Sequence, residues 1–200
     1  FKYIEGEVKT RFGKTEKDFV FNYKHLSLEK ANEMNKWLFD ANKICDDLGI
    51  PRIRGINPLS SRKYQADMGD GVLRYNKGWG DRPLIPISKW KFGDPLKDRP
   101  VVTGHYLSGD KRDLNTLWHE FGHHIHQNIG VKTLSDLRNP ILEQELKQIR
   151  ISKGIQSSAS KYGSTNQVEW FAENYSLLKQ DRLDLIGDTF KELIKKYNIK

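Results

Sequence analysis

Three residues within one five-residue stretch have the types and spacing of a metal-dependent hydrolase site: His119, Glu120 and His123. On a helix, residues four apart lie on one face, so both imidazoles can bind a single zinc ion from the same side. Glu120 lies roughly 100° around the helix from His119, where a general base for a metal-activated water should stand. We call residues 119–123 the HExxH motif. A pattern this short also recurs by chance, so the rest of the chain must complete the site.

A catalytic zinc ion usually has three protein ligands, and two carboxylates are candidates for the third. A histidine six residues after His123, as in metzincins, is excluded because that position is Ile129. Glu143 lies twenty residues after His123, a spacing similar to that of thermolysin-like enzymes. Lys147, one turn later, instead favours an exposed ion pair with Glu143. The other candidate is Glu169.

The residues around Glu169 favour it as the third ligand. Asn166 can cap a helix with Glu169 in its first turn, where the helix dipole stabilises a negative charge. Glu173 follows one turn later and can accept a hydrogen bond from a zinc-bound histidine. A polar stripe on an ordinary amphipathic helix would produce the same pattern, so Glu143 stays open as an alternative.

Three further histidines lie close to the motif in the sequence. His126 is seven residues from His119, about 10 Å further along the helix axis, so it cannot share the ion with both ligands. His124 points roughly 100° away from His123. We expect structural or surface roles for both, with a substrate contact as the alternative. His105, before the helix, is expected to be solvated, with a place near the cleft as the alternative.

The elements that must position these residues are visible as periodic patterns. Apolar residues at helical spacing predict a long helix from an N-cap at Ser27 to a stop at Gly49. The motif helix is predicted to begin with Asp113 as N-cap and to end at Gly130. Gly122, inside that helix, indicates close approach of a neighbouring backbone.

The sequence patterns of the remaining N-terminal segments predict strands and loops. Residues 1–25 suggest one or two strands, the second around Phe19–Tyr23. The segment 51–112 is rich in glycine and proline, with short strand candidates at 71–75, 84–87 and 100–103. The chain is thus predicted to be α+β and a single domain over residues 1–200. Its N-terminal lobe (1–112) is predicted to hold a mixed sheet and the long helix, and its second lobe (113–200) to be mostly helical.

Composition fits a globular domain. The 200 residues are 36% hydrophobic, no apolar run of about 18 residues is present, and we expect no membrane span. The Phe1-Lys2-Tyr3 start lacks a signal-peptide core and a Met, so a mature product or a segment of a longer protein is expected. The net charge is +8, but the basic residues are scattered along the chain. This distribution favours solvated helix faces over a surface that binds nucleic acid. The single cysteine, Cys45, excludes an internal disulfide and is expected to be a buried thiol.

Four segments of the second half of the chain carry a longer pattern than the motif alone. They are His119-Glu120-Phe121-Gly122-His123, Tyr162-Gly163, Thr165-Asn166 and Glu169-Trp170-Phe171-Ala172-Glu173. In the order, spacing and flanking residues of these segments, the chain closely resembles the metalloprotease domain of anthrax lethal factor and its relatives. The resemblance covers roughly residues 115–180.

The resemblance implies a zincin-like metalloprotease fold with one zinc ion per chain, bound by His119, His123 and Glu169. It also implies that Glu120 is the general base and that Glu173 supports the site. Tyr162 matches the family's active-site tyrosine, whose phenol would donate a hydrogen bond to the oxyanion or help to protonate the leaving amine.

The same resemblance extends less clearly to the N-terminal lobe. The segment 68–76 looks like the edge strand over the motif helix, along which an extended peptide binds by adding a strand. An internal hairpin strand is the alternative. The substrate-binding residues would then be Gly71, Val72, Leu73, Arg74 and Tyr75.

Together these observations predict a zinc-dependent endopeptidase of the lethal factor-like type, acting as a monomer on a protein or peptide substrate. A secreted toxin domain, or part of a larger exported or phage-associated bacterial protein, is the expected setting. Two alternatives remain: a non-catalytic zinc-containing domain of such a protein, and a DNA-associated metalloprotease. Steeply salt-dependent DNA binding would indicate the second.

Overall fold

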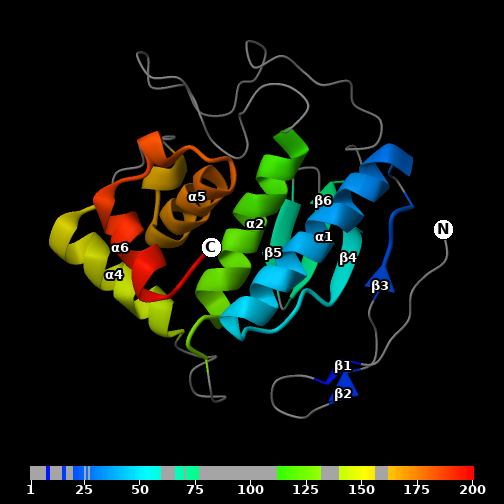
Figure 1. The fold of residues 1–200 in the computed structure, drawn as a ribbon, viewed down its shortest axis with the longest axis horizontal. Helices are drawn as coiled ribbons and strands as arrows, with labels where there is room; N and C mark the ends of the chain where they lie inside the picture. The colour runs from blue at the N-terminus through cyan, green and yellow to red at the C-terminus, as the bar shows by residue number, and fades with distance from the viewer. Residues whose placement is uncertain are drawn as a thin grey trace. The chain divides into compact units, whose positions relative to one another are not determined.

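The structure is a computed structural model that describes residues 8–9, 15–16, 20–24, 26, 28–59, 66–69, 71–76, 112–131, 140–155 and 162–200. The chain divides into two compact units, Phe1–Pro83 and Leu84–Lys200. The described part of the first unit combines strands with one helix, and that of the second is helical (Figure 1). The α+β class is therefore confirmed, and helices make up most of the described secondary structure. The predicted strands at 84–87 and 100–103, and His105, lie outside the described residues.

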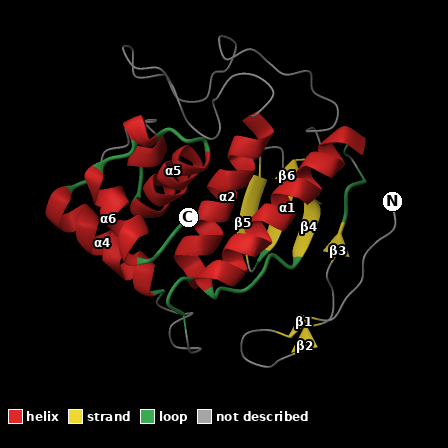
Figure 2. Cartoon of the chain, viewed as in Figure 1, coloured by secondary structure: helices red, strands yellow, loops and turns green. Residues whose placement is uncertain are grey.

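A mixed sheet forms the centre of the first unit (Figure 2). Its strand order is β3-β4-β6-β5, and a separate antiparallel pair is formed by β1 and β2. Strand β4 pairs in parallel with β3 and β6, whereas β5 and β6 are antiparallel. The strands are β1 (Val8–Lys9), β2 (Thr15–Glu16), β3 (Val20–Phe21), β4 (Gly55–Leu59), β5 (Ala66–Gly69) and β6 (Val72–Asn76).

Strand β6 confirms the strand predicted at 71–75 but not its place in the sheet. It is hydrogen-bonded to β4 along one side and to β5 along the other. Both rows of its backbone groups are therefore occupied, so the predicted edge strand is wrong and the alternative, an internal hairpin strand, is confirmed. An extended peptide cannot be added along Gly71, Val72, Leu73, Arg74 and Tyr75. Among the described strands of this part of the sheet, β5 holds the outer position.

Helix α1 (Leu28–Leu48) confirms the long helix expected from the sequence. Its apolar face is buried at three- and four-residue steps, as in Ala31, Met34, Trp37, Ala41 and Cys45. Gly49 follows with a φ of +64°, a left-handed conformation that glycine adopts without steric cost. Burial raises the pKa of the Cys45 thiol to about 12, and the charge of Asp46 adds to this effect. The thiol is thus buried, as predicted, and its raised pKa disfavours the reactive thiolate.

The second unit is built around helix α5, whose residues Trp170–Leu177 are all buried. Its helices are α2 (Arg112–Asn128), α4 (Ile141–Lys153), α5 (Gln167–Lys179) and α6 (Asp188–Lys196), with short 3-10 turns at Tyr162–Ser164 and Leu183–Leu185. Helix α2 begins at Arg112, so Asp113 lies in its first turn and is not the predicted N-cap. The predicted exit at Gly130 is confirmed by its φ of +73°. None of the described helices has both the length and the hydropathy needed to cross a bilayer.

Helices α2 and α5 lie in close contact at Gly122. A Cβ atom placed on Gly122 would lie only 2.8 Å from Cα of Ala172 and 3.3 Å from its Cβ. The neighbouring atom at the shorter distance belongs to the backbone and cannot rotate away. The close approach predicted for Gly122 is therefore confirmed, and it holds the HExxH helix against the helix that carries Glu169.

Replacing Gly122 by Ala is expected to destabilise the fold by about 1–3 kcal/mol, because the added methyl group forces the two helices apart. Urea unfolding followed by circular dichroism would measure this loss. Gly187→Ser is a suitable control, since a Cβ atom at Gly187 meets nothing within 4 Å. Equal stability of Gly122→Ala and the unmodified chain would contradict the proposed tight crossing.

Candidate metal site

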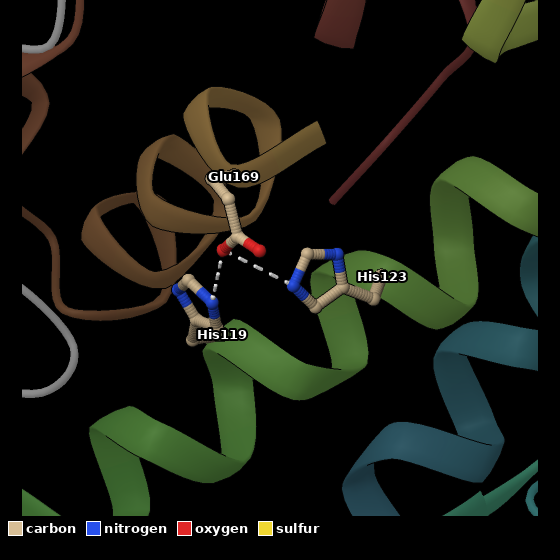
Figure 3. Close-up of side chains that lie close together, drawn as sticks. All are labelled: His119, His123 and Glu169. Carbon is tan, nitrogen blue, oxygen red and sulfur yellow. Dashed lines mark hydrogen bonds and ion pairs between the residues drawn. The ribbon is translucent and has the colours of Figure 1, made fainter. Parts of the chain in front are cut away.

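The predicted ligands converge at the crossing of α2 and α5. His119 and His123 extend from one face of α2, and Glu169 extends toward them from α5 (Figure 3). The Oε2 atom of Glu169 lies 3.1 Å from Nε2 of His119 and 3.4 Å from Nε2 of His123. One ligand atom from each of the three residues lies within 4.8 Å of the others. Side chains 50 residues apart in sequence thus face a common point.

Burial of the three side chains is graded across the site. His119 is only 1% exposed, whereas the side chains of His123 and Glu169 are 14% and 16% exposed. The site therefore has a closed side at His119 and a partly accessible side at the other two residues. A catalytic metal site needs one coordination position open to water or substrate, and in this site the partly exposed side is where such a position would lie.

For two of the three residues, Glu169 and His119, the pKa shifts favour the deprotonated form that binds a metal. Burial alone would raise the pKa of the Glu169 carboxyl, but the hydrogen bonds with His119 and His123 outweigh it and hold that pKa well below the ordinary value. Burial lowers the pKa of His119, more strongly than Glu169 raises it. Near neutral pH, Glu169 is therefore an anion and His119 is a neutral imidazole, as metal coordination requires.

The pKa of His123 is shifted in the opposite direction to that of His119. Burial would lower its pKa, but the hydrogen bond with Glu169 and the negative charge of Glu120 together raise it. A proton on His123 then pairs with Glu169 and occupies the place where a cation would bind.

Zinc affinity is consequently expected to fall as the pH is lowered. Because the pKa of His123 is raised, its proton persists to higher pH than on an ordinary histidine, and a metal must displace it. Each displaced proton weakens apparent affinity by up to about tenfold per pH unit below that pKa. Competition titrations with a chromophoric chelator at several pH values would measure the slope. An affinity that does not vary with pH would contradict histidine ligation.

The N-terminal cap of α5 explains the position of Glu169. The Asn166 side-chain oxygen accepts hydrogen bonds from the backbone N–H groups of Val168 and Glu169, at 3.0 Å and 2.9 Å. Asn166 has an extended backbone and so marks where the helix begins. Both the predicted cap and the place of Glu169 in the first turn are confirmed.

Removing this cap with Asn166→Ala is expected to cost about 1 kcal/mol of stability and to weaken zinc binding, because the first turn of α5 loses its fixed geometry. Asn166→Asp keeps an accepting oxygen and is the matched control. Thermal unfolding and a zinc titration of both variants would check this. If the Ala and Asp variants bound zinc equally well, the cap would not position Glu169.

The other carboxylates of the prediction occupy distinct places. Glu143 lies on α4 and forms the expected ion pair with Lys147, with Oε1 3.1 Å from Nζ. It does not belong to the metal-ligand group, which among the described residues consists of His119, His123 and Glu169. Glu120 is 5% exposed, and its charge reaches His123. Glu173 is fully buried on α5, one turn after Glu169.

The catalytic and supporting roles of Glu120, Glu173 and Tyr162 remain predictions. Tyr162 begins the 3-10 turn Tyr162–Ser164 just before α5, and its side chain lies outside the described part of the structure. The backbone thus places Tyr162 next to the helix that carries Glu169, close in sequence to the cap at Asn166.

Two histidines for which the sequence predicts no ligand role are buried near the site. His124 stacks on Phe121, and His126 contacts Phe171 edge to face. Both are buried, so a surface role is wrong for either residue. Sequence reasoning missed one contact: Nε2 of His126 lies 3.1 Å from Nδ1 of His123. The three-residue separation on one helix was the available signal.

Two imidazole nitrogens and one carboxylate oxygen fit zinc and, by donor type, related divalent transition metals. All three described ligands belong to the second unit, so its fold alone positions them. Comparison of the chain with protein-family models, curated proteins and solved structures gave no match.

Proposed function

We propose that this chain is a zinc-dependent endopeptidase. The observation that carries this proposal is the convergence of His119, His123 and Glu169, with the candidate base Glu120 on the same helix as the two histidines. A His-His-Glu set with a carboxylate base is the arrangement of zinc peptidases that use an activated water. The resemblance to lethal factor-like metalloproteases supports the same activity.

The roles of the chain's own residues follow from their chemistry. When bound, zinc would act as a Lewis acid that lowers the pKa of a water molecule and polarises the scissile carbonyl. Glu120 accepts the proton of the attacking water and later delivers it to the departing nitrogen. The Glu120 side chain is only 5% exposed, so this carboxylate lies in a largely dry environment. Tyr162 would donate a hydrogen bond to the carbonyl oxygen as negative charge develops there.

A combined metal analysis and cleavage assay tests this proposal. Purified protein is expected to contain close to one zinc per chain and to cleave members of a peptide library. Treatment with a chelator should abolish cleavage, and added zinc should restore it. Tightly bound zinc without cleavage of any library peptide would favour a non-catalytic zinc domain instead.

A further inference from the structure

The contact between His123 and His126 joins a metal ligand to a buried imidazole on the same helix. Nδ1 of His123 and Nε2 of His126 are 3.1 Å apart, with ring centroids 5.3 Å apart and planes at 81°. At this distance the two nitrogens share one proton, which one of them donates to the other.

The position of the metal site decides which nitrogen donates. The Nε2 atom of His123 faces Glu169, and the ring's other nitrogen points away from that carboxylate (Figure 3). A metal between the three ligands would therefore bind His123 through Nε2. A neutral imidazole carries one proton, so coordination at Nε2 leaves the proton on Nδ1. Nε2 of His126 must then be the acceptor.

We propose that His126 is a positioning residue, whose Nε2 accepts a hydrogen bond from the Nδ1–H group of His123 and so fixes the ring that binds the metal. This inference rests on the metal site of the proposed function. Partners of this kind hold the tautomer and orientation of metal-binding histidines and contribute to metal affinity.

The surroundings of His126 suit that task. The residue is 3% exposed, and its ring lies edge to face against Phe171, with centroids 6.2 Å apart. Phe171 belongs to α5, the helix that also carries Glu169. Packing therefore holds the His126 ring, and through it the orientation of His123 is linked to the helix that supplies the third ligand.

The matched variants His126→Gln and His126→Met separate hydrogen bonding from packing. Their side chains have similar length, but only Gln offers an oxygen near the place of Nε2, and Met adapts readily to a buried site. We expect His126→Met to lower zinc affinity about 10- to 100-fold and His126→Gln to recover most of that loss. Competition titration would give the affinities, and the absorption spectrum of the Co²⁺-substituted protein would report the ligand geometry.

Two controls complete the experiment. His124→Met alters another buried histidine of α2 and should keep the unmodified zinc affinity. Thermal unfolding of the metal-free variants establishes that each one folds. Unchanged affinity in His126→Met, or no recovery in His126→Gln, would overturn the inference. Absence of zinc binding in the unmodified chain would overturn both proposals, whereas zinc binding without peptide cleavage would contradict only the endopeptidase activity.

Discussion

Glu120→Gln is expected to lower kcat for peptide cleavage by about 100- to 10,000-fold while zinc stays bound. The amide keeps the size of the side chain and one accepting oxygen, but it is too weak a base to take the proton of the attacking water. Because Glu120 is not one of the three grouped ligands, the metal site itself should persist. Steady-state kinetics on a cleaved peptide, together with the zinc content of the same sample, would measure both effects.

Glu143→Gln is the control for this experiment, since Glu143 lies on α4 in an ion pair with Lys147. It should cleave at the unmodified rate. A Glu120→Gln variant with nearly full activity would exclude Glu120 as the general base. Loss of zinc together with loss of activity would instead assign Glu120 to the metal site itself.

Glu169→Ala is expected to reduce zinc affinity by more than about 100-fold, because it removes one of three protein ligands. This loss is larger than the one expected when a residue that only supports a ligand is removed. The substitution also removes the carboxylate whose Oε2 atom lies 3.1 Å from Nε2 of His119 and 3.4 Å from Nε2 of His123. A competition titration would quantify the loss, and cleavage should disappear with the metal.

Glu143→Ala is the matched control, because it tests the alternative third ligand directly. It should bind zinc as tightly as the unmodified chain. If Glu143→Ala lost zinc and Glu169→Ala did not, the third ligand would be misassigned.

The sequence was most informative where chemistry and local helix geometry coincide. The spacing of His119 and His123 set both imidazoles on one face of α2, and the cap at Asn166 set Glu169 in the first turn of α5. Gly122 is a further case, because a glycine inside a helix is costly and the close contact with Ala172 explains it.

Contacts between residues far apart in the sequence could not be predicted as well. Apolar and polar residues can alternate in both an inner and an outer strand of a sheet. Residues 71–75 therefore predicted a strand, but not that β6 lies between β4 and β5. Asp113 was predicted to precede α2 as its N-cap, but the helix begins at Arg112. Several polar residues near position 113 can begin a helix, so the sequence does not fix its first residue. The contact of His126 with His123 depends on side-chain rotation and on Phe171 from another helix, which periodicity does not specify. The zincin-like fold and the lethal factor-like assignment stay predictions.

Anomalous diffraction from crystals grown with zinc, recorded on both sides of the zinc absorption edge, tests the metal site most directly. We predict one strong peak per chain among Nε2 of His119, Nε2 of His123 and Oε2 of Glu169, at about 2.0–2.2 Å from each atom. A peak at other residues, or no peak in well-ordered crystals, would contradict a zinc centre at this helix crossing.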